Sequence, residues 1–107
     1  MLSSIHYHIL VAIGDGRAHG YAIMQEIAQR TGGKVQILPG TLYSTIKKLV
    51  ANAMIEECPP PARHKNADER RRYYRLTRRG KHAAGEETER LASLVRFARE
   101  KGFAPTR

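Results

Sequence analysis

The histidines and the single cysteine have the side chains for metal or nucleophilic chemistry, but their spacing suits neither. His6 and His8 are two residues apart in a segment with helical periodicity, about 200° around the axis, so one helix cannot direct both to a metal ion. Cys58 stands alone, which excludes an internal disulfide and a cysteine-based zinc cluster; we expect it half-buried in a strand, a redox switch being the alternative. No Ser-His-Asp or Cys-His grouping is legible either. The sequence therefore predicts no catalytic residue, no metal site and no cofactor, and an enzyme is not expected.

The residues whose number and spacing do indicate a function are basic, and the function is binding of a polyanion. From Arg63 to Arg79 there are eight basic residues against two acidic ones, Asp68 and Glu69. The whole chain carries a formal net charge of +9 over 107 residues, so its summed field attracts polyanions, with nucleic acid first. A loop of this charge suits a DNA backbone or a minor groove, where arginine is favoured. The alternatives are a loop that is basic only for solubility and, more weakly, a membrane surface, for which the loop lacks an apolar anchor.

A second cationic surface is predicted on a helix from Thr41 to Ala53. At about 100° per residue, its apolar sector holds Leu42, Ile46, Leu49, Val50 and Ala53. The opposite face is small, polar and positive, and consists of Ser44, Lys47, Lys48 and Ala51, with Thr41, Asn52 and Tyr43 at its margins. No carboxylate interrupts this helix, whereas solvated helices usually mix charges. The face suits a major groove, and the helix N-terminus favours a phosphate; an ordinary solvated helix is the alternative.

Several elements must position these cations. Periodicity predicts helices at 3–13 and 20–31, a minimal strand at 35–37, strands at 55–58 and 71–76 around the basic loop, and a helix at 78–101 that Thr77 caps. This order is that of a winged helix-turn-helix, a mainly α fold with a small β-hairpin. In the last strand, alternation sends Tyr74 and Leu76 inward and Tyr73 and Arg75 outward. We expect a DNA-binding domain at 1–76, a dimerisation helix at 77–101 and a disordered tail at 102–107.

The last helix carries an apolar stripe that calls for a partner. Leu91, Leu94, Val95 and Ala98 follow helical spacing on a helix about 36 Å long, which outruns so small a domain. The economical partner is the same helix of a second chain, with Leu2, Ile5 and Ile9 of the first helix added. A homodimer would also place two reading helices about one DNA turn apart. The alternative is a stripe that folds back on its own domain.

Three motifs in order, HGYAIMQEI, PGTLYSTIKKL and DERRRYYRLTRRG, make residues 5–100 resemble the short-form PadR family of bacterial transcriptional regulators. The resemblance implies a homodimeric winged helix-turn-helix, usually a repressor, on an inverted-repeat operator, often released by a small hydrophobic or phenolic ligand. It implies DNA contacts at Tyr21, Thr41, Tyr43, Ser44 and Lys47, with Arg70, Arg71 and Arg72 near the wing; packing is the alternative role for both tyrosines. Three further DNA contacts are predicted from positive charge alone: Lys48, Arg63 and Lys65. Phe97 is the candidate for an effector space between subunits.

Two other classes of function stay open, a winged-helix module that binds protein and a general nucleic-acid binder without operator preference. The acid-free third helix disfavours the first, and the dimer stripe disfavours the second. No apolar run approaches the ~20 residues of a membrane span, and no signal peptide is legible, so we expect a cytoplasmic, nucleoid-associated protein. The target genes, the effector and the choice between repression and activation are not legible in the sequence.

Overall fold

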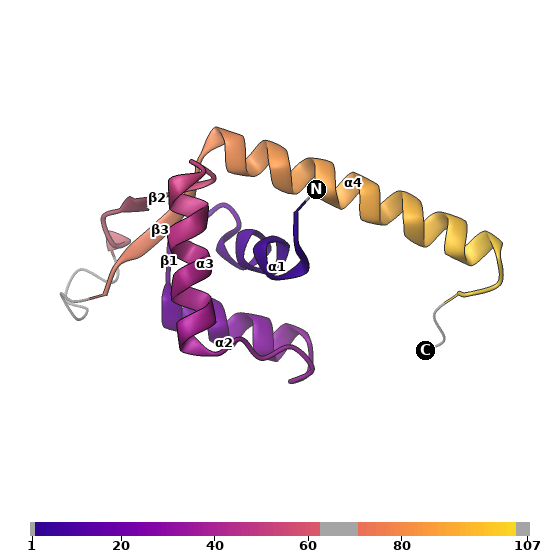
Figure 1. Ribbon diagram of the computed structural model, residues 1–107, viewed down its shortest axis with the longest axis horizontal. Coiled ribbons are helices and arrows are strands. Elements are labelled where there is room, and N and C mark those ends of the chain that lie inside the picture. Colours follow the sequence, from indigo (N-terminus) through magenta and orange to yellow (C-terminus); the bar gives the residue numbers. More distant parts are fainter. Residues whose placement is uncertain (1, 63–70, 105–107) are drawn as a thin grey trace.

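The chain forms four helices and one three-stranded antiparallel sheet in a computed structural model, which describes residues 2–62 and 71–104 (Figure 1). The elements in chain order are α1 (Ser4–Ile13), β1 (Ala18–His19), α2 (Gly20–Arg30), α3 (Pro39–Ala51), β2 (Ile55–Cys58), β3 (Tyr73–Leu76) and α4 (Arg78–Glu100). Helices α2 and α3 make the helix-turn-helix, and β2 and β3 make the hairpin of the wing. The predicted winged helix-turn-helix is confirmed.

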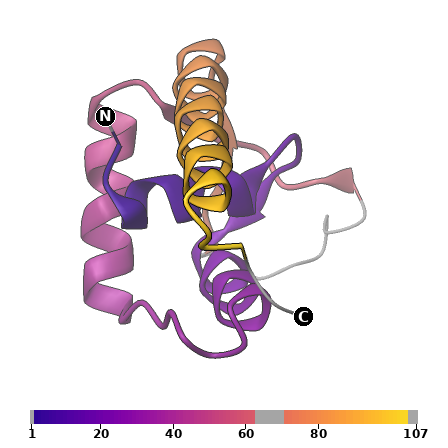
Figure 2. The same ribbon diagram turned by 90° about the vertical axis from the view of Figure 1, so that its right-hand side faces the viewer.

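A single apolar cluster fixes the position of α3. Figures 1 and 2 show α1 in the middle of the molecule, with the other three helices arranged around it. Helix α3 contributes Leu42, Ile46 and Leu49 to the cluster, which confirms most of its predicted apolar sector. Burial of one such side chain contributes roughly 1.5–3 kcal/mol relative to exposure. The buried sector therefore holds α3 firmly, with its polar face toward solvent.

The C-terminal end of α3 departs from the prediction. Val50 is 41% exposed, and Ala53 lies beyond the helix with a φ of 58°, in the left-handed region. The N–H of Ala53 donates to the carbonyl of Val50 (3.0 Å), and that of Met54 donates to Leu49 (2.9 Å), which is the bond pair of a Schellman motif. The chain thus leaves the helix before Ala53, and neither Val50 nor Ala53 belongs to the core.

Strand β3 is the central strand, with β1 and β2 antiparallel on either side of it. The strand predicted at 35–37 is wrong, because these residues have no regular structure. The N–H of Val35 donates instead to the Thr31 hydroxyl (3.0 Å) just after α2. The third strand of the sheet is Ala18–His19, two residues that pair with Tyr74 and Tyr73.

Both tyrosines of β3 are buried, although only one was predicted inward. Tyr74 joins the core, Leu76 packs against it, and Arg75 is exposed, as alternation predicts. Tyr73 is only 3% exposed, so its predicted outward position is wrong. The ring of His19 on β1 packs edge-on against Tyr73, with centroids 5.3 Å apart, because the two residues are paired across the neighbouring strands. Tyr73 is therefore structural.

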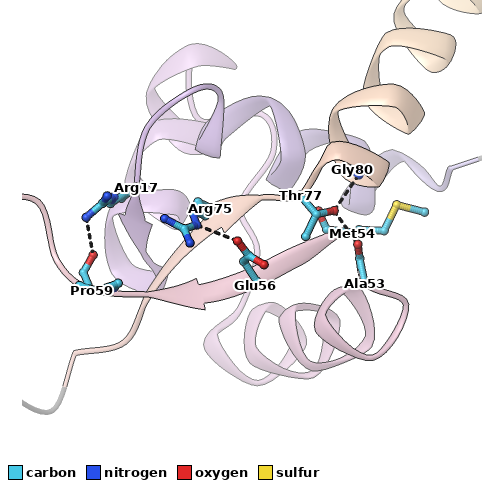
Figure 3. Close-up of polar contacts among 8 residues, drawn as sticks. All are labelled: Arg17, Ala53, Met54, Glu56, Pro59, Arg75, Thr77 and Gly80. Carbon is cyan, nitrogen blue, oxygen red and sulfur yellow. Dashed lines mark hydrogen bonds and ion pairs between the residues drawn. The ribbon is translucent and has the colours of Figure 1, made fainter.

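The start of α4 is joined to the end of α3 (Figure 3). The hydroxyl of Thr77 lies 2.6 Å from the carbonyl of Ala53 and accepts the N–H of Gly80 at 3.0 Å, which confirms the predicted N-cap. The backbone N–H of Thr77 donates to the carbonyl of Met54 (3.1 Å). The direction of α4 is thereby set by the turn that ends α3.

Helix α4 extends beyond the other elements at its C-terminal half (Figure 1). Leu94 and Phe97 there are 57% and 59% exposed, and Val95 is also exposed, while Leu91 and Ala98 are partly buried. The helix ends in a second Schellman motif at Gly102 and Phe103, two residues that were predicted to belong to a disordered tail. Residues 105–107 of that tail lie outside the described residues.

Candidate nucleic-acid interface

The outer face of α3 is polar, cationic and exposed. Thr41, Ser44, Lys47 and Lys48 are all exposed on it, as predicted. Among the residues that the structure describes, neither lysine forms an ion pair, so both charges remain available to an anion. The hydroxyl of Ser44 donates to the carbonyl of Thr41 (3.2 Å), which leaves its oxygen able to accept a further hydrogen bond.

The N-terminus of α3 is open to an anion. Pro39 occupies the first turn, where its fixed φ suits a helix start, and the N-cap Leu38 makes no side-chain cap bond. The first turn holds no acidic residue. Its backbone N–H groups and the positive end of the helix dipole therefore favour a phosphate near Gly40 and Thr41.

Two tyrosines and two arginines meet beside α3. Tyr21 at the start of α2 and Tyr43 on α3 are 53% and 51% exposed, so neither is a core residue. They line a groove of about 420 Å³ with Arg71 and Arg72, which precede β3. A second groove, of about 260 Å³, runs between α3 and the hairpin and shares Tyr43 and Arg72 with the first. The two grooves thus form one connected surface, which holds five of the predicted contacts: Tyr21, Tyr43, Lys47, Arg71 and Arg72.

The arginines of this surface differ in their partners. Arg72 donates to both carboxylate oxygens of Glu57 (2.9 and 3.2 Å), and Arg75 donates to Glu56 at 2.8 Å (Figure 3 shows the second pair). These pairs follow from the hairpin register, which sets Glu56 opposite Arg75. Arg71 lies 3.5 Å from Nε2 of His19 and has no carboxylate among its described contacts. Arg71 is therefore the freer cation, whereas Arg72 must share its charge with Glu57.

The remaining predicted contacts of the wing are not described. Arg63, Lys65 and Arg70 lie outside the described residues, so the part that each was predicted to play stays a prediction. What sequence reasoning missed here is that two carboxylates, Glu56 and Glu57, pair with arginines of the hairpin. His19 caps α2 by accepting the N–H of Ala22 at its Nδ1 (3.2 Å) and lines the groove.

The cysteine and the possible metal ligands of the described residues form no reactive site. Cys58 is buried at the end of β2, as predicted, and burial raises the pKa of its thiol although Arg17 lowers it in part. A thiol held protonated is a poor redox switch. No three His, Cys, Asp or Glu side chains in the described ranges 2–62 and 71–104 could hold a metal ion. Within those ranges no helix has the length and apolar character to cross a membrane.

The dimerisation candidates divide into two groups. Leu94 and Val95 are exposed, and Leu91 and Ala98 are partly so, which leaves the α4 stripe without cover from its own chain. Leu2 and Ile5 are partly buried against the core, and Ile9 is 0% exposed within it. Ile9 therefore has no surface to offer a second chain, because α1 lies at the centre of the fold, and its predicted place in the dimer surface is wrong. Phe97 is exposed beside the stripe and lines no cavity described here.

Comparison with known proteins finds transcriptional regulators. Residues 9–86 match the transcriptional regulator PadR-like family. The transcriptional regulator Rv3488 of Mycobacterium tuberculosis is 34% identical over 95 residues, which cover 88% of this chain and 81% of that protein. A transcriptional regulator from Clostridium thermocellum has a similar structure (TM-score 0.71, 25% identity, 89% of both chains covered). Bacillus subtilis PadR, solved in complex with operator DNA, shares the fold (TM-score 0.68, 20% identity, 82% of this chain and 48% of that one).

Proposed function

This chain belongs to the PadR-like family of transcriptional regulators, and from that premise we propose that it represses transcription by binding an inverted-repeat operator as a homodimer. It is a DNA-binding regulator and not an enzyme. In the proposal α3 lies in the major groove, with Ser44 and Thr41 at base edges or phosphates and Lys47 and Lys48 on phosphates. The wing follows the backbone through Arg71.

The observation that carries this proposal is the connected surface of α2, α3 and the residues before β3. It joins two exposed tyrosines, Lys47 and Arg71, and its one acidic residue, Glu57, is paired with Arg72. The outer face of α3 adds Lys48 and an open helix N-terminus, and it holds no acidic residue. A surface that bound protein would be richer in exposed aliphatic side chains at its centre. Here Leu42, Ile46 and Leu49 of α3 point into the core, and Val50 is the exposed aliphatic side chain among the polar and cationic ones of that helix.

The homodimer is proposed from α4. Of the stripe of Leu91, Leu94, Val95 and Ala98, the middle two are exposed and the outer two partly buried, on a helix that projects past its own domain. Pairing of two such stripes would bury the exposed leucine and valine and hold two copies of α3 at a fixed separation, as a two-fold symmetric operator requires. Release by a small hydrophobic or phenolic ligand near Phe97 is part of the proposal, because such a space would form only between two subunits.

The test is a titration by fluorescence anisotropy at several salt concentrations. The wild-type chain is added to a duplex from upstream of its own gene and to a scrambled duplex of equal length. We expect two chains per upstream duplex and a preference of about 10³ or more over the scrambled one. Equal, steeply salt-dependent binding to both would favour the general nucleic-acid binder, and binding to neither would favour the protein-binding module.

A further inference from the structure

Gly20, the first residue of α2, lies against the ring of Tyr43 on α3. A Cβ at Gly20 would be 2.7 Å from Cε1, 2.8 Å from the phenol oxygen and 2.9 Å from Cζ of Tyr43. These three atoms are its nearest neighbours, so the space that a side chain would take here belongs to one residue. The outer end of the Tyr43 ring therefore rests on the backbone of α2.

The backbone conformation does not explain the glycine. Gly20 is not among the residues with positive φ, which are Gly14, Gly32, Gly33, Gly102 and Ala53. Glycine is also among the least favourable residues in a helix, and here it begins one. What remains is close approach, because only a residue without Cβ lets the aromatic ring contact the helix backbone.

We infer that Gly20 is a positioning residue for DNA binding, which holds the Tyr43 side chain in the groove between α2 and the residues before β3. The inference rests on the proposed function. Tyr43 rises from the outer face of α3, half of its surface is exposed, and it lines both grooves of the connected surface. With its ring against Gly20, the phenol hydroxyl lies at the start of α2, beside Tyr21, His19 and Arg71. There the hydroxyl lies near the guanidinium of Arg71, which has no carboxylate among its described contacts, so that both groups would donate to one phosphate.

A larger residue at position 20 would act through this one contact. The ring of Tyr43 would have to move away from α2, since the new Cβ would come within 3.0 Å of three of its atoms. The hydroxyl would then leave the groove, while α2 itself would keep or improve its helical stability. A substitution at Gly20 should therefore change the affinity for DNA without lowering the stability of the fold.

The experiment is a double-mutant cycle. We would measure the dissociation constant for the upstream duplex at one salt concentration, and the melting temperature, for wild type, Gly20→Ala, Tyr43→Ala and the double variant. Gly85→Ala is the matched control, because its Cβ would meet no atom within 4 Å on exposed α4. We expect Gly20→Ala to weaken binding about tenfold or more, as loss of one hydrogen bond to a charged group would. The double variant should bind as Tyr43→Ala does, and Gly85→Ala should bind as wild type.

Any other result contradicts the inference, and the pattern of binding shows whether the proposed function fails with it. Failure of the wild-type chain to bind any duplex removes both the proposed function and the inference. If wild type binds but Gly20→Ala or Tyr43→Ala binds equally well, only the inference fails. A loss from Gly20→Ala that persists undiminished in the Tyr43→Ala background shows that Gly20 acts on its own. Should Gly20→Ala fail to fold, the same cycle is read in melting temperature, where the Tyr43→Ala background must restore stability.

Discussion

Gly80 in the first turn of α4 lies directly against the carbonyl group of Met54, so that a Cβ at Gly80 would overlap its oxygen (Figure 3 shows both residues). The same carbonyl accepts the backbone N–H of Thr77. The approach of the two backbones lets Thr77 cap α4 while it bonds to the turn that ends α3. The connection between α3 and α4 therefore depends on the absence of a Cβ at residue 80.

Gly80→Ala should destabilise the fold. The new Cβ meets backbone atoms, which cannot rotate away, so α4 must shift, at a cost of about 1–3 kcal/mol, typical of overpacking. Gly85→Ala in the same helix should instead raise the free energy of unfolding by up to ~1 kcal/mol, because its surroundings are open. Urea unfolding followed by circular dichroism measures both. Equal effects of the two changes would contradict the proposed backbone contact.

Ala53→Gly should stabilise the protein. Ala53 has a φ of 58° at the end of α3, where a Cβ costs roughly 1–2 kcal/mol and glycine costs nothing. The greater freedom of glycine in the unfolded chain removes part of that gain, so the expected net gain is about 0.5 kcal/mol. The same urea titration measures it, and a lower free energy of unfolding for the variant would contradict the left-handed conformation.

Lys47→Ala and Ser44→Ala should weaken DNA binding in different ways. Removal of the lysine should weaken binding to every duplex and reduce the slope of log K against log salt by about one. Ser44→Ala should change the preference for the operator over scrambled DNA and leave the slope unchanged. Lys101→Ala, which removes the same charge at the far end of α4, is the control. If Ser44→Ala lowers the affinity for both duplexes equally, Ser44 does not contact base edges.

Leu94→Gln should weaken the dimer. Leu94 is 57% exposed in the single chain, and the two-fold axis makes one substitution remove two leucines from the interface. The dimer dissociation constant from sedimentation equilibrium should rise at least about tenfold. Glu89→Gln, exposed on roughly the opposite side of α4 at about 100° per residue, is the control. A monomeric wild-type chain would refute the dimer itself.

Glu87→Gln should remove part of the acid sensitivity of the fold. Glu87 is buried, and the hydrogen bonds from Arg90 hold the pKa of its carboxyl below the usual 4.5, assisted by the N–H of Leu2. Because the folded pKa is lowered, its stabilisation is complete above pH 4.5 and is lost as pH falls through the folded value. The melting temperature of the variant should therefore be lower at pH 7, and the difference from wild type should shrink toward pH 3.

The helices and strands that carry the connected surface could be predicted because each depends on residues close in sequence. The apolar sector of Leu42, Ile46 and Leu49 repeats at helical spacing, and Thr77 precedes a helix as an N-cap must. The polar face of α3 follows from the same repeat. Alternation likewise placed Tyr74 and Arg75 on opposite sides of β3.

Other features depend on contacts between residues far apart in the chain, which no local pattern contains. Ala18–His19 is a strand only because β3 lies beside it, and that pairing in turn buries Tyr73. The hairpin register decides that Glu56 and Glu57 neutralise Arg75 and Arg72, which leaves Arg71 as the freer cation.

By itself, then, the sequence determined that this is a basic winged helix with one cationic reading helix and an apolar stripe on α4. Helical and strand periodicity indicate which side of an element is apolar, and the net charge follows from the composition alone. Only the tertiary structure decided which cations remain unpaired, that Ile9 is core rather than interface, and that Gly20 and Gly80 are places where backbone must approach a neighbour. Packing and pairing are properties of two segments at once, so neither segment's sequence contains them alone.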